Sequence, residues 1–278
     1  MRSTLTSFTA LSNLQQRVIA ALIGAVVIVN AIYWHEWSYF ALFFGLMAAA
    51  QLEFYKLLGL DGNVPLKTYG TFCGLLIYTL TFGVEQGLFG ARWFFVVPPV
   101  VSGIFLIKLY KREKKPFTNI AFTFLGIIYV ALPFALLHFA VFAGGAYDYQ
   151  VVLGVLFLLW SSDTGAYFAG VNFGRRQLFA RVSPKKSWEG AVGGLVAAVG
   201  MATALSYGFR HLPAWQWFCI AVIIVVTGTY GDLVESLFKR SIAIKDSGTA
   251  IPGHGGFLDR FDGLLLSSPF IAAFLNAF

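Results

Sequence analysis

Charged side chains are scarce in this sequence: they make up 12% of its 278 residues. A typical soluble domain carries about a quarter, so this chain has too few charges to cover a water-facing surface. The same scarcity, beside 58% hydrophobic residues, excludes intrinsic disorder and fibrous repeats. Together with a mean hydropathy of +0.73, it leaves a polytopic membrane protein.

Cysteine is nearly absent as well, since Cys73 and Cys219 are the only two, and both lie inside apolar runs. This excludes a disulfide framework and a cysteine-based metal site, and we expect both to be small core residues. A net charge of +7 is compatible with nucleic-acid binding in a soluble protein. In a membrane chain, however, basic residues gather on the cytoplasmic side, so no nucleic-acid partner is expected.

Long apolar runs are abundant. A membrane-spanning helix needs about 20 predominantly apolar residues, with about 17 to 25 tolerated. The sequence therefore predicts an all-α, polytopic integral membrane protein with about nine transmembrane helices. The last candidate is short for a full span, which favours a tilted or interfacial helix. The candidates cover residues 18–34, 37–60, 68–84, 93–110, 117–142, 151–172, 188–208, 214–235 and 264–278.

The basic residues predict the topology. With the N-terminus inside, all of the 20 lysine and arginine residues except Arg92 and Arg210 fall on inner segments. This is a strong positive-inside bias. The first span continues into Tyr33, Trp34 and Trp37, which is typical of an interfacial aromatic belt, so we expect it to be retained rather than cleaved. The short chain without an organelle presequence favours a bacterial inner membrane.

Polar groups concentrate in the second half of the chain. We expect residues 1–145 to form a scaffold of about five spans and residues 146–278 to form a catalytic region with a cytoplasmic loop. Asp163 lies about a dozen residues into the span 151–172, where an ionisable side chain is expensive in lipid. It should face a polar cavity or a partner. The alternative is a structural carboxylate that neighbouring hydroxyls satisfy.

A basic pair precedes the predicted helix 188–208. Lys185 and Lys186 lie beside a helix N-terminus that Ser187 can cap, with Glu189 in the first turn. Positive charge, free backbone N–H groups and the helix dipole together favour binding of an anion. An ordinary positive-inside flank is the alternative.

Acidic residues mark the end of the span 214–235. If the helix continues, Asp232, Glu235 and Ser236 share one face. Two carboxylates there could hold a hard cation through oxygen ligands. A solvated helix end is the alternative, although helix C-termini favour cations over acids.

The densest group of ionisable residues follows, interleaved with glycines that let the backbone approach a ligand closely. Lysine and arginine bind phosphate oxygens, while carboxylates complete a Mg²⁺ site whose other ligands are water and substrate phosphates. A merely structural loop would not need this mixture. The residues are Lys239, Arg240, Lys245, Asp246, His254, Asp259, Arg260 and Asp262.

These residues form a known pattern. The run Ser236–Asp262 resembles, at every position, the signature of the phosphatidate cytidylyltransferases (CDP-diglyceride synthetases). The resemblance extends to Asp163–Tyr167 and to Ser183–Gly190. The first 150 residues are similar to the family only in hydropathy.

The resemblance implies a reaction in which CTP and phosphatidate give CDP-diacylglycerol and pyrophosphate with Mg²⁺ as cofactor, and it implies a homodimer. The site would lie at the cytoplasmic interface, because the lipid arrives from the bilayer and the nucleotide from the cytosol. The implied roles are as follows: Asp232 and Asp259 as first metal ligands, Asp262 and Asp163 as supports, Lys239, Arg240, Lys245 and Arg260 on phosphates, Lys185, Lys186, Ser187, Asp246 and Asp163 in substrate binding, and His254 as a proton carrier or, preferably, a phosphate donor.

Three other functions compete with this interpretation. A secondary transporter would suit many spans with intramembrane Asp163, but we find no paired broken helices in two repeats. A CTP-dependent kinase of a long-chain alcohol would share the chemistry, although the complete signature favours phosphatidate. A passive structural protein would not explain so many polar groups at one membrane face.

Overall fold

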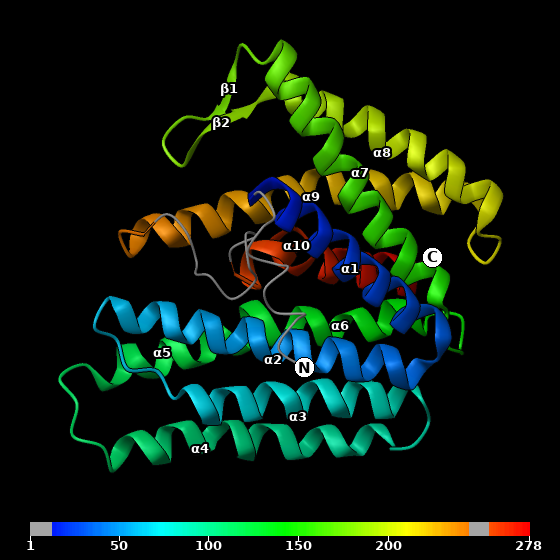
Figure 1. Cartoon of the computed structure of the whole chain (residues 1–278). Helices are drawn as coiled ribbons and strands as arrows, with labels where there is room; N and C mark the ends of the chain where they lie inside the picture. The colour runs from blue at the N-terminus through cyan, green and yellow to red at the C-terminus, as the bar shows by residue number, and fades with distance from the viewer. Residues whose placement is uncertain (1–12, 245–255) are drawn as a thin grey trace, which may run out of the picture.

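The computed structural model describes residues 13–244 and 256–278, which fold into a bundle of helices (Figure 1). Apolar runs form continuous helices because backbone polar groups in a membrane must be bonded within the chain. The helices are α1 (Asn13–Trp34), α2 (Glu36–Leu60), α3 (Lys67–Glu85), α4 (Val97–Leu109, preceded by a 3₁₀ turn at Ala91–Val96), α5 (Pro116–Gly126), α6 (Leu132–Val141, joined to α5 by a π turn at Ile127–Ala131), α7 (Tyr149–Phe173), α8 (Trp188–Gly208), α9 (Ala214–Ser241) and α10 (Leu258–Ala277).

Local sequence signals set where several helices begin. Asp148 accepts a hydrogen bond from the Gln150 N–H at 2.9 Å and so caps α7. Ser187 accepts one from the Gly190 N–H at 3.1 Å and caps α8, as the sequence predicts. Pro116 occupies the first position of α5, where its missing N–H costs nothing.

The helices coincide with all nine predicted stretches within the described residues. Six of them are long and apolar enough to cross a membrane, which confirms a helical, multi-span protein. The apolar segment found in α1 within the described residues, Ala21–Trp34, is shorter than these six. The count of nine spans and an inner N-terminus stay predictions. The last helix was predicted too short: the predicted stretch begins at residue 264, whereas α10 begins at Leu258 and has 20 residues.

A small β-hairpin corrects the all-α prediction. Strands β1 (Gln177–Phe179) and β2 (Ser183–Ser187) pair antiparallel between α7 and α8. Strands of 3 and 5 residues are too short to show the alternating pattern by which a strand is recognised. The fold is therefore nearly all-α, and the hairpin carries the predicted basic pair.

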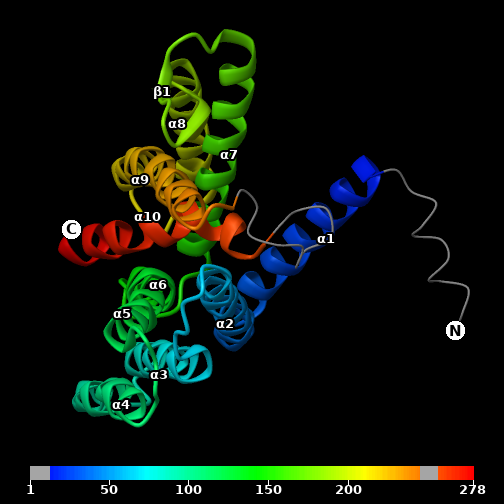
Figure 2. The same ribbon diagram turned by 90° about the vertical axis from the view of Figure 1, so that its left-hand side faces the viewer.

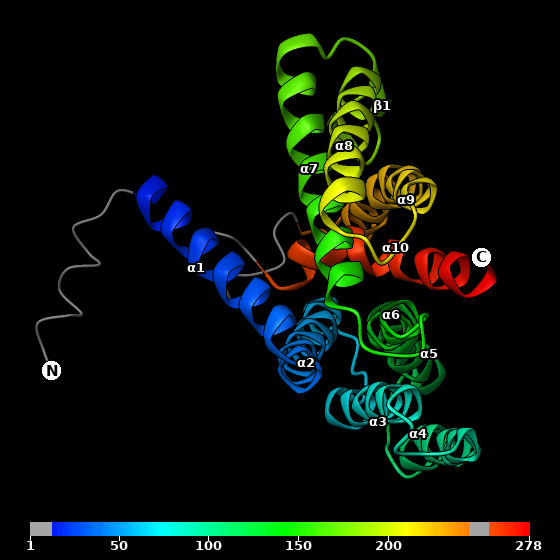
Figure 3. The same cartoon turned by 90° about the vertical axis from the view of Figure 1, so that its right-hand side faces the viewer.

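The connections between helices alternate between the two ends of the bundle. The β-hairpin and the α4–α5 connection lie at the left end in Figure 1, whereas the α1–α2 and α8–α9 connections lie at the right. Figure 2 looks onto the left end and shows α10 running across between α9 and α6. The opposite view shows α1 leaning away from the other helices (Figure 3).

The packing of α10 joins the two halves of the chain. The ring of Phe261 on α10 lies 5.7 Å from that of Phe134 on α6, which lies 6.1 Å from that of Phe43 on α2. All three belong to one cluster of buried hydrophobic residues that also includes Trp217 of α9. Packing against the apolar first half of the chain thus anchors α10, the helix that carries Asp259, Arg260 and Asp262.

Candidate active site

Three carboxylates meet where α9 crosses α10. Asp232 and Glu235 lie about one turn apart on α9, and Asp262 lies near the start of α10. One ligand oxygen from each lies within 4.8 Å of the others, and we call these three residues the acidic cluster. The predicted shared face of Asp232 and Glu235 therefore points at α10.

Close approach of the two helix backbones makes this cluster possible. A Cβ atom at Gly231 would lie 2.5 Å from the backbone oxygen of Asp262 and 3.1 Å from Gly263 Cα. Any larger residue at position 231 would therefore push α10 away from α9. Because Gly231 directly precedes Asp232, the contact brings that carboxylate to Asp262.

Two lysines supply positive charge around the acidic cluster. Lys186 from β2 forms an ion pair with Asp232 and donates a hydrogen bond to the Thr229 backbone oxygen at 3.2 Å. The Nζ atom of Lys239 lies 3.1 Å from a carboxylate oxygen of Glu235. Lys186 therefore connects the hairpin to α9, and the hairpin becomes part of the site.

Glu235 is the most deeply buried member of the cluster, with 1% of its surface exposed. Its Oε2 atom accepts a hydrogen bond from Lys239, whereas its Oε1 atom has no hydrogen-bond partner within the described residues. A buried carboxylate oxygen is costly unless it is bonded or coordinates a cation. Three converging carboxylates with one free buried oxygen fit a hard divalent cation, which prefers oxygen ligands.

Asp259 lies one step away from the cluster. Its Oδ1 atom accepts a hydrogen bond from Lys239 at 2.9 Å, and its Oδ2 atom accepts a longer one from the Gly256 N–H at 3.4 Å. The group of mutually close carboxylates within the described residues contains Glu235 in its place. The predicted metal role of Asp259 stays a prediction, and Glu235 joins Asp232 and Asp262 as a candidate ligand.

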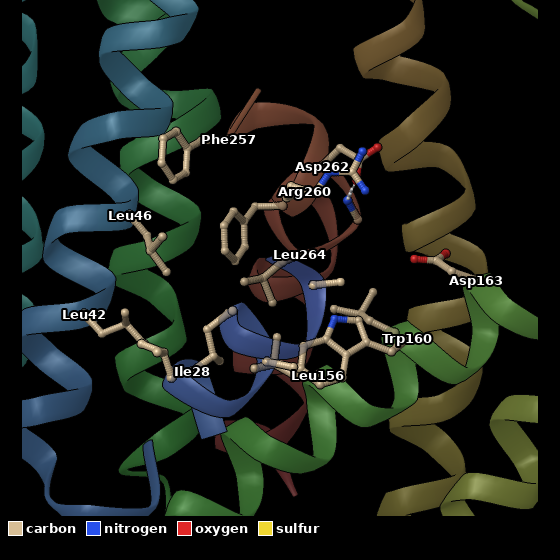
Figure 4. A pocket seen from close by; sticks show the side chains of 17 residues that line it. Ile28, Leu42, Leu46, Leu156, Trp160, Asp163, Phe257, Arg260, Asp262 and Leu264 are labelled. Carbon is tan, nitrogen blue, oxygen red and sulfur yellow. Dashed lines mark hydrogen bonds between the residues drawn. The ribbon is translucent and has the colours of Figure 1, made fainter. Parts of the chain in front are cut away.

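A cavity of about 550 Å³ opens between α1, α2, α7 and α10 and reaches the acidic cluster (Figure 4). Asp163, Arg260 and Asp262 line one part of it, and the other described lining residues are apolar. Figure 4 shows Asp163 on α7 facing the charged residues of α10 across this space. Arg260 is exposed and forms no ion pair with the described residues. Its guanidinium group is therefore available to an anion.

The other predicted site residues divide into three groups. Lys185 is exposed on β2, and Arg240 is exposed near the end of α9, where it donates to the Ile244 backbone oxygen at 3.4 Å. Ser187 is engaged as the cap of α8. Three predicted residues lie outside the described part of the chain, namely Lys245, Asp246 and His254.

Two further acidic residues near the site accept hydrogen bonds from backbone N–H groups. A carboxylate oxygen of Glu189 accepts hydrogen bonds from the backbone N–H groups of Arg175 and Arg176 at 3.0 and 3.1 Å, which fixes the chain between α7 and β1. Glu53 of α2 accepts one from the Phe257 N–H at 2.7 Å and so holds the chain just before α10. We did not predict Glu53, although an ionisable residue inside an apolar run is the signal that identifies it.

Comparison with known proteins gives this site a chemical context. The chain belongs to the cytidylyltransferase family, whose model matches residues 15–278. It is 31% identical over 284 aligned residues to a phosphatidate cytidylyltransferase of Haemophilus influenzae, covering 94% of this chain and 98% of that protein. A phosphatidate cytidylyltransferase of Pseudomonas aeruginosa is 34% identical over 93% of this chain and 88% of its own length. One from Bacillus subtilis is 28% identical over 96% and 99%.

Proposed function

We propose that this protein transfers the cytidylyl group of CTP to phosphatidate and releases pyrophosphate, giving CDP-diacylglycerol for phospholipid synthesis. The observation that carries the proposal is the continuity between an apolar cavity and a charged site, with Asp262 lining the first and belonging to the second. This arrangement suits a lipid whose chains stay in an apolar space while its phosphate meets a nucleotide. The names of the full-length relatives support the same reaction.

The acidic cluster fits Mg²⁺ because its donors are carboxylate oxygens and the Oε1 atom of Glu235 has no other partner among the described residues. We assign Asp232, Glu235 and Asp262 to hold the ion. Asp259, which shares Lys239 with Glu235, is proposed as a further ligand. When bound, Mg²⁺ would neutralise negative charge on the triphosphate.

The reaction exchanges one phosphorus–oxygen bond for another. A phosphate oxygen of phosphatidate forms a bond to the α-phosphorus of CTP, and the bond from that phosphorus to the bridging oxygen of pyrophosphate breaks. Phosphatidate is already largely ionised near neutral pH, so the attacking oxygen requires no strong base. The protein's task is to position the reactants and to offset their charge.

Basic side chains on three elements perform that task. Arg260 on α10 faces the cavity and binds the lipid phosphate, whereas Lys186 on β2 and Lys239 on α9 offset charge beside the acidic cluster. The remaining predicted residues complete the cradle for the nucleotide phosphates. We assign Lys185, Arg240, Lys245 and Asp246 to that cradle, Asp163 and Ser187 to its edge, and His254 as a hydrogen-bond donor to a phosphate.

The arrangement of charge indicates where the site faces. The connections with nearly all lysines and arginines lie at the end of the bundle that carries the hairpin (Figure 1). Positive-inside charge supports a position of this end in the cytosol, where CTP is found. We therefore propose nine spans with the N-terminus inside, a bacterial inner membrane, a scaffold of residues 1–145 with a catalytic region of residues 146–278, and a homodimer.

A transfer assay tests the proposed function. Purified protein in detergent is supplied with phosphatidate, Mg²⁺ and CTP labelled in its cytosine ring. We expect label to enter the lipid phase, and Asp232→Asn, which changes a member of the acidic cluster, to slow this by at least about a hundredfold, or about 2.7 kcal/mol. Folded protein that consumes CTP only with a long-chain alcohol would assign it to lipid phosphorylation. Absence of any CTP use would favour a transporter.

A further inference from the structure

One wall of the cavity is a strip of α1 with small side chains. Ala21, Gly24, Ala25 and Ile28 all line the cavity, and their spacing puts them on one face of the helix. Val27 lines the cavity as well. Three of these five residues are glycine or alanine, so much of the α1 wall contributes little volume to the space. Leucines of α2 and α7 stand on the other walls, and Figure 4 shows several of them around Ile28.

We propose that this cavity binds one acyl chain of the lipid substrate and that Gly24 determines how much chain it accepts. The proposal rests on the proposed function and adds an acyl-chain site to it. The cavity suits an amphiphile with an anionic head: among the described residues, its walls are apolar except around Asp163, Arg260 and Asp262. Arg260, which has no ion pair with the described residues, marks the position of the lipid phosphate.

The dimensions favour a single chain. A volume of about 550 Å³ lies within the range of ordinary small-molecule pockets, which is about 300–1,000 Å³. Ala21 and Ile28 are seven positions apart on the helix, a rise of about 10 Å along the wall. One chain that runs along this strip from Arg260 would occupy such a space, while the second chain would stay in the bilayer.

Gly24 is the position where this wall can be changed without damage to the fold. A Cβ atom at Gly24 would meet no described atom within 4 Å, so a side chain there has open space to enter. Because Gly24 lines the cavity, that open space is the proposed site of the chain. A phenylalanine at this position would take volume from the acyl chain rather than from the protein.

The test compares dioleoyl-phosphatidate with dihexanoyl-phosphatidate in the full-length protein. Each methylene that loses its contact weakens binding by about fourfold. We expect Gly24→Phe to lower the kcat/KM ratio of the long-chain to the short-chain lipid by at least about tenfold, chiefly through KM. Gly24→Leu is expected to give a smaller shift in the same direction.

A matched glycine on α2 provides the control. Gly45 also has no described atom within 4 Å of an added Cβ, but it does not line the cavity. Gly45→Phe should therefore leave the chain-length ratio unchanged. An unchanged ratio in both Gly24 variants, or an equal shift in Gly45→Phe, would overturn the acyl-chain site. Wild-type protein that transfers label to neither lipid would instead refute the proposed function.

Discussion

The ammonium group of Lys239 lies 2.9 Å from a carboxylate oxygen of Asp259, and this ion pair joins the end of α9 to the start of α10. The same ammonium group lies 3.1 Å from Glu235. One lysine therefore bridges two acids that belong to different parts of the site. Glu235 belongs to the acidic cluster, whereas Asp259 lies outside it in the first turn of α10.

We predict that Lys239 and Asp259 are energetically coupled. Their side chains are 13% and 15% exposed, so removal of either partner leaves a largely buried charge. Lys239→Met removes a partner of two acids and should lower the free energy of unfolding by about 3 kcal/mol. Asp259→Asn leaves Lys239 paired with Glu235 and should cost less, about 1.5 kcal/mol. The double variant should lose less than the sum, with a coupling of about 0.5–3 kcal/mol in denaturant unfolding in detergent. Strictly additive losses would show that the ion pair does not stabilise the junction.

Glu235 should control the Mg²⁺ requirement. Glu235→Gln keeps the shape of the side chain but removes the charge of the most buried candidate ligand. We expect the Mg²⁺ concentration for half-maximal activity to rise by about tenfold or more, since even residues behind a ligand have effects of that size. Activity titrated against Mg²⁺ measures this directly. Lower activity with an unchanged Mg²⁺ midpoint would remove Glu235 from the metal site.

The hairpin should contribute to nucleotide binding through Lys186. Its ion pair with Asp232 and its bond to Thr229 place the positive charge beside the acidic cluster. Lys186→Met should lower kcat/KM for CTP by about 10- to 100-fold, as expected for the loss of charge-assisted hydrogen bonds. Arg181→Met, at an exposed position of the same hairpin, is the matched control. Equal effects of the two substitutions would mean that the hairpin acts only through its overall charge.

A polar network in the first half of the chain should make stability depend on pH. Lys108, with 1% of its side chain exposed, bonds to both carboxylate oxygens of Glu113 at 2.6 and 2.7 Å, and Asn119 donates to the second at 2.6 Å. Burial raises the pKa of Glu113, but the bonds from Lys108 and Asn119 outweigh it, so the pKa lies below its ordinary value. The resulting stabilisation is complete above the ordinary value and is lost as the pH falls through the lowered one.

Glu113→Gln tests this network. We expect the variant to be less stable than wild type by about 1.5 kcal/mol near neutral pH, and the difference to shrink as the pH falls below about 4. Thermal unfolding in detergent across that range gives the measurement. Asp61→Asn, at an exposed carboxyl of the neighbouring connection, should show no such trend. A difference that is constant with pH would contradict the assigned role of Glu113.

Hydropathy and capping signals predicted the helices well because both are local properties. The apolar runs determine where each helix lies, and Ser187 bonds to a backbone N–H only three residues later when it caps α8. The hairpin was missed because its strands are too short to show the alternation of apolar and polar residues that identifies a strand. The start of α10 was missed because Asp259, Arg260 and Asp262 interrupt its apolar run, although the helix includes them.

The site was predictable in content but not in its contacts. The sequence places Asp232 and Glu235 on one face, but only the approach of α10 at Gly231 selects Glu235 and Asp262 as neighbours. The same holds for Glu53, whose partner Phe257 lies more than 200 residues later in the chain. Such contacts arise from tertiary packing of helices, which a local pattern does not encode.

Transfer of the α-phosphate is the central claim, and two differently labelled samples of CTP test it most directly. Wild-type protein is incubated with phosphatidate, Mg²⁺ and CTP labelled at either the α- or the γ-phosphate, and the lipid phase is counted. The account predicts that the α-label enters the lipid while the γ-label leaves with pyrophosphate. Lipid that carries the γ-label without the α-label would contradict the account, because it would identify phosphoryl transfer rather than cytidylyl transfer.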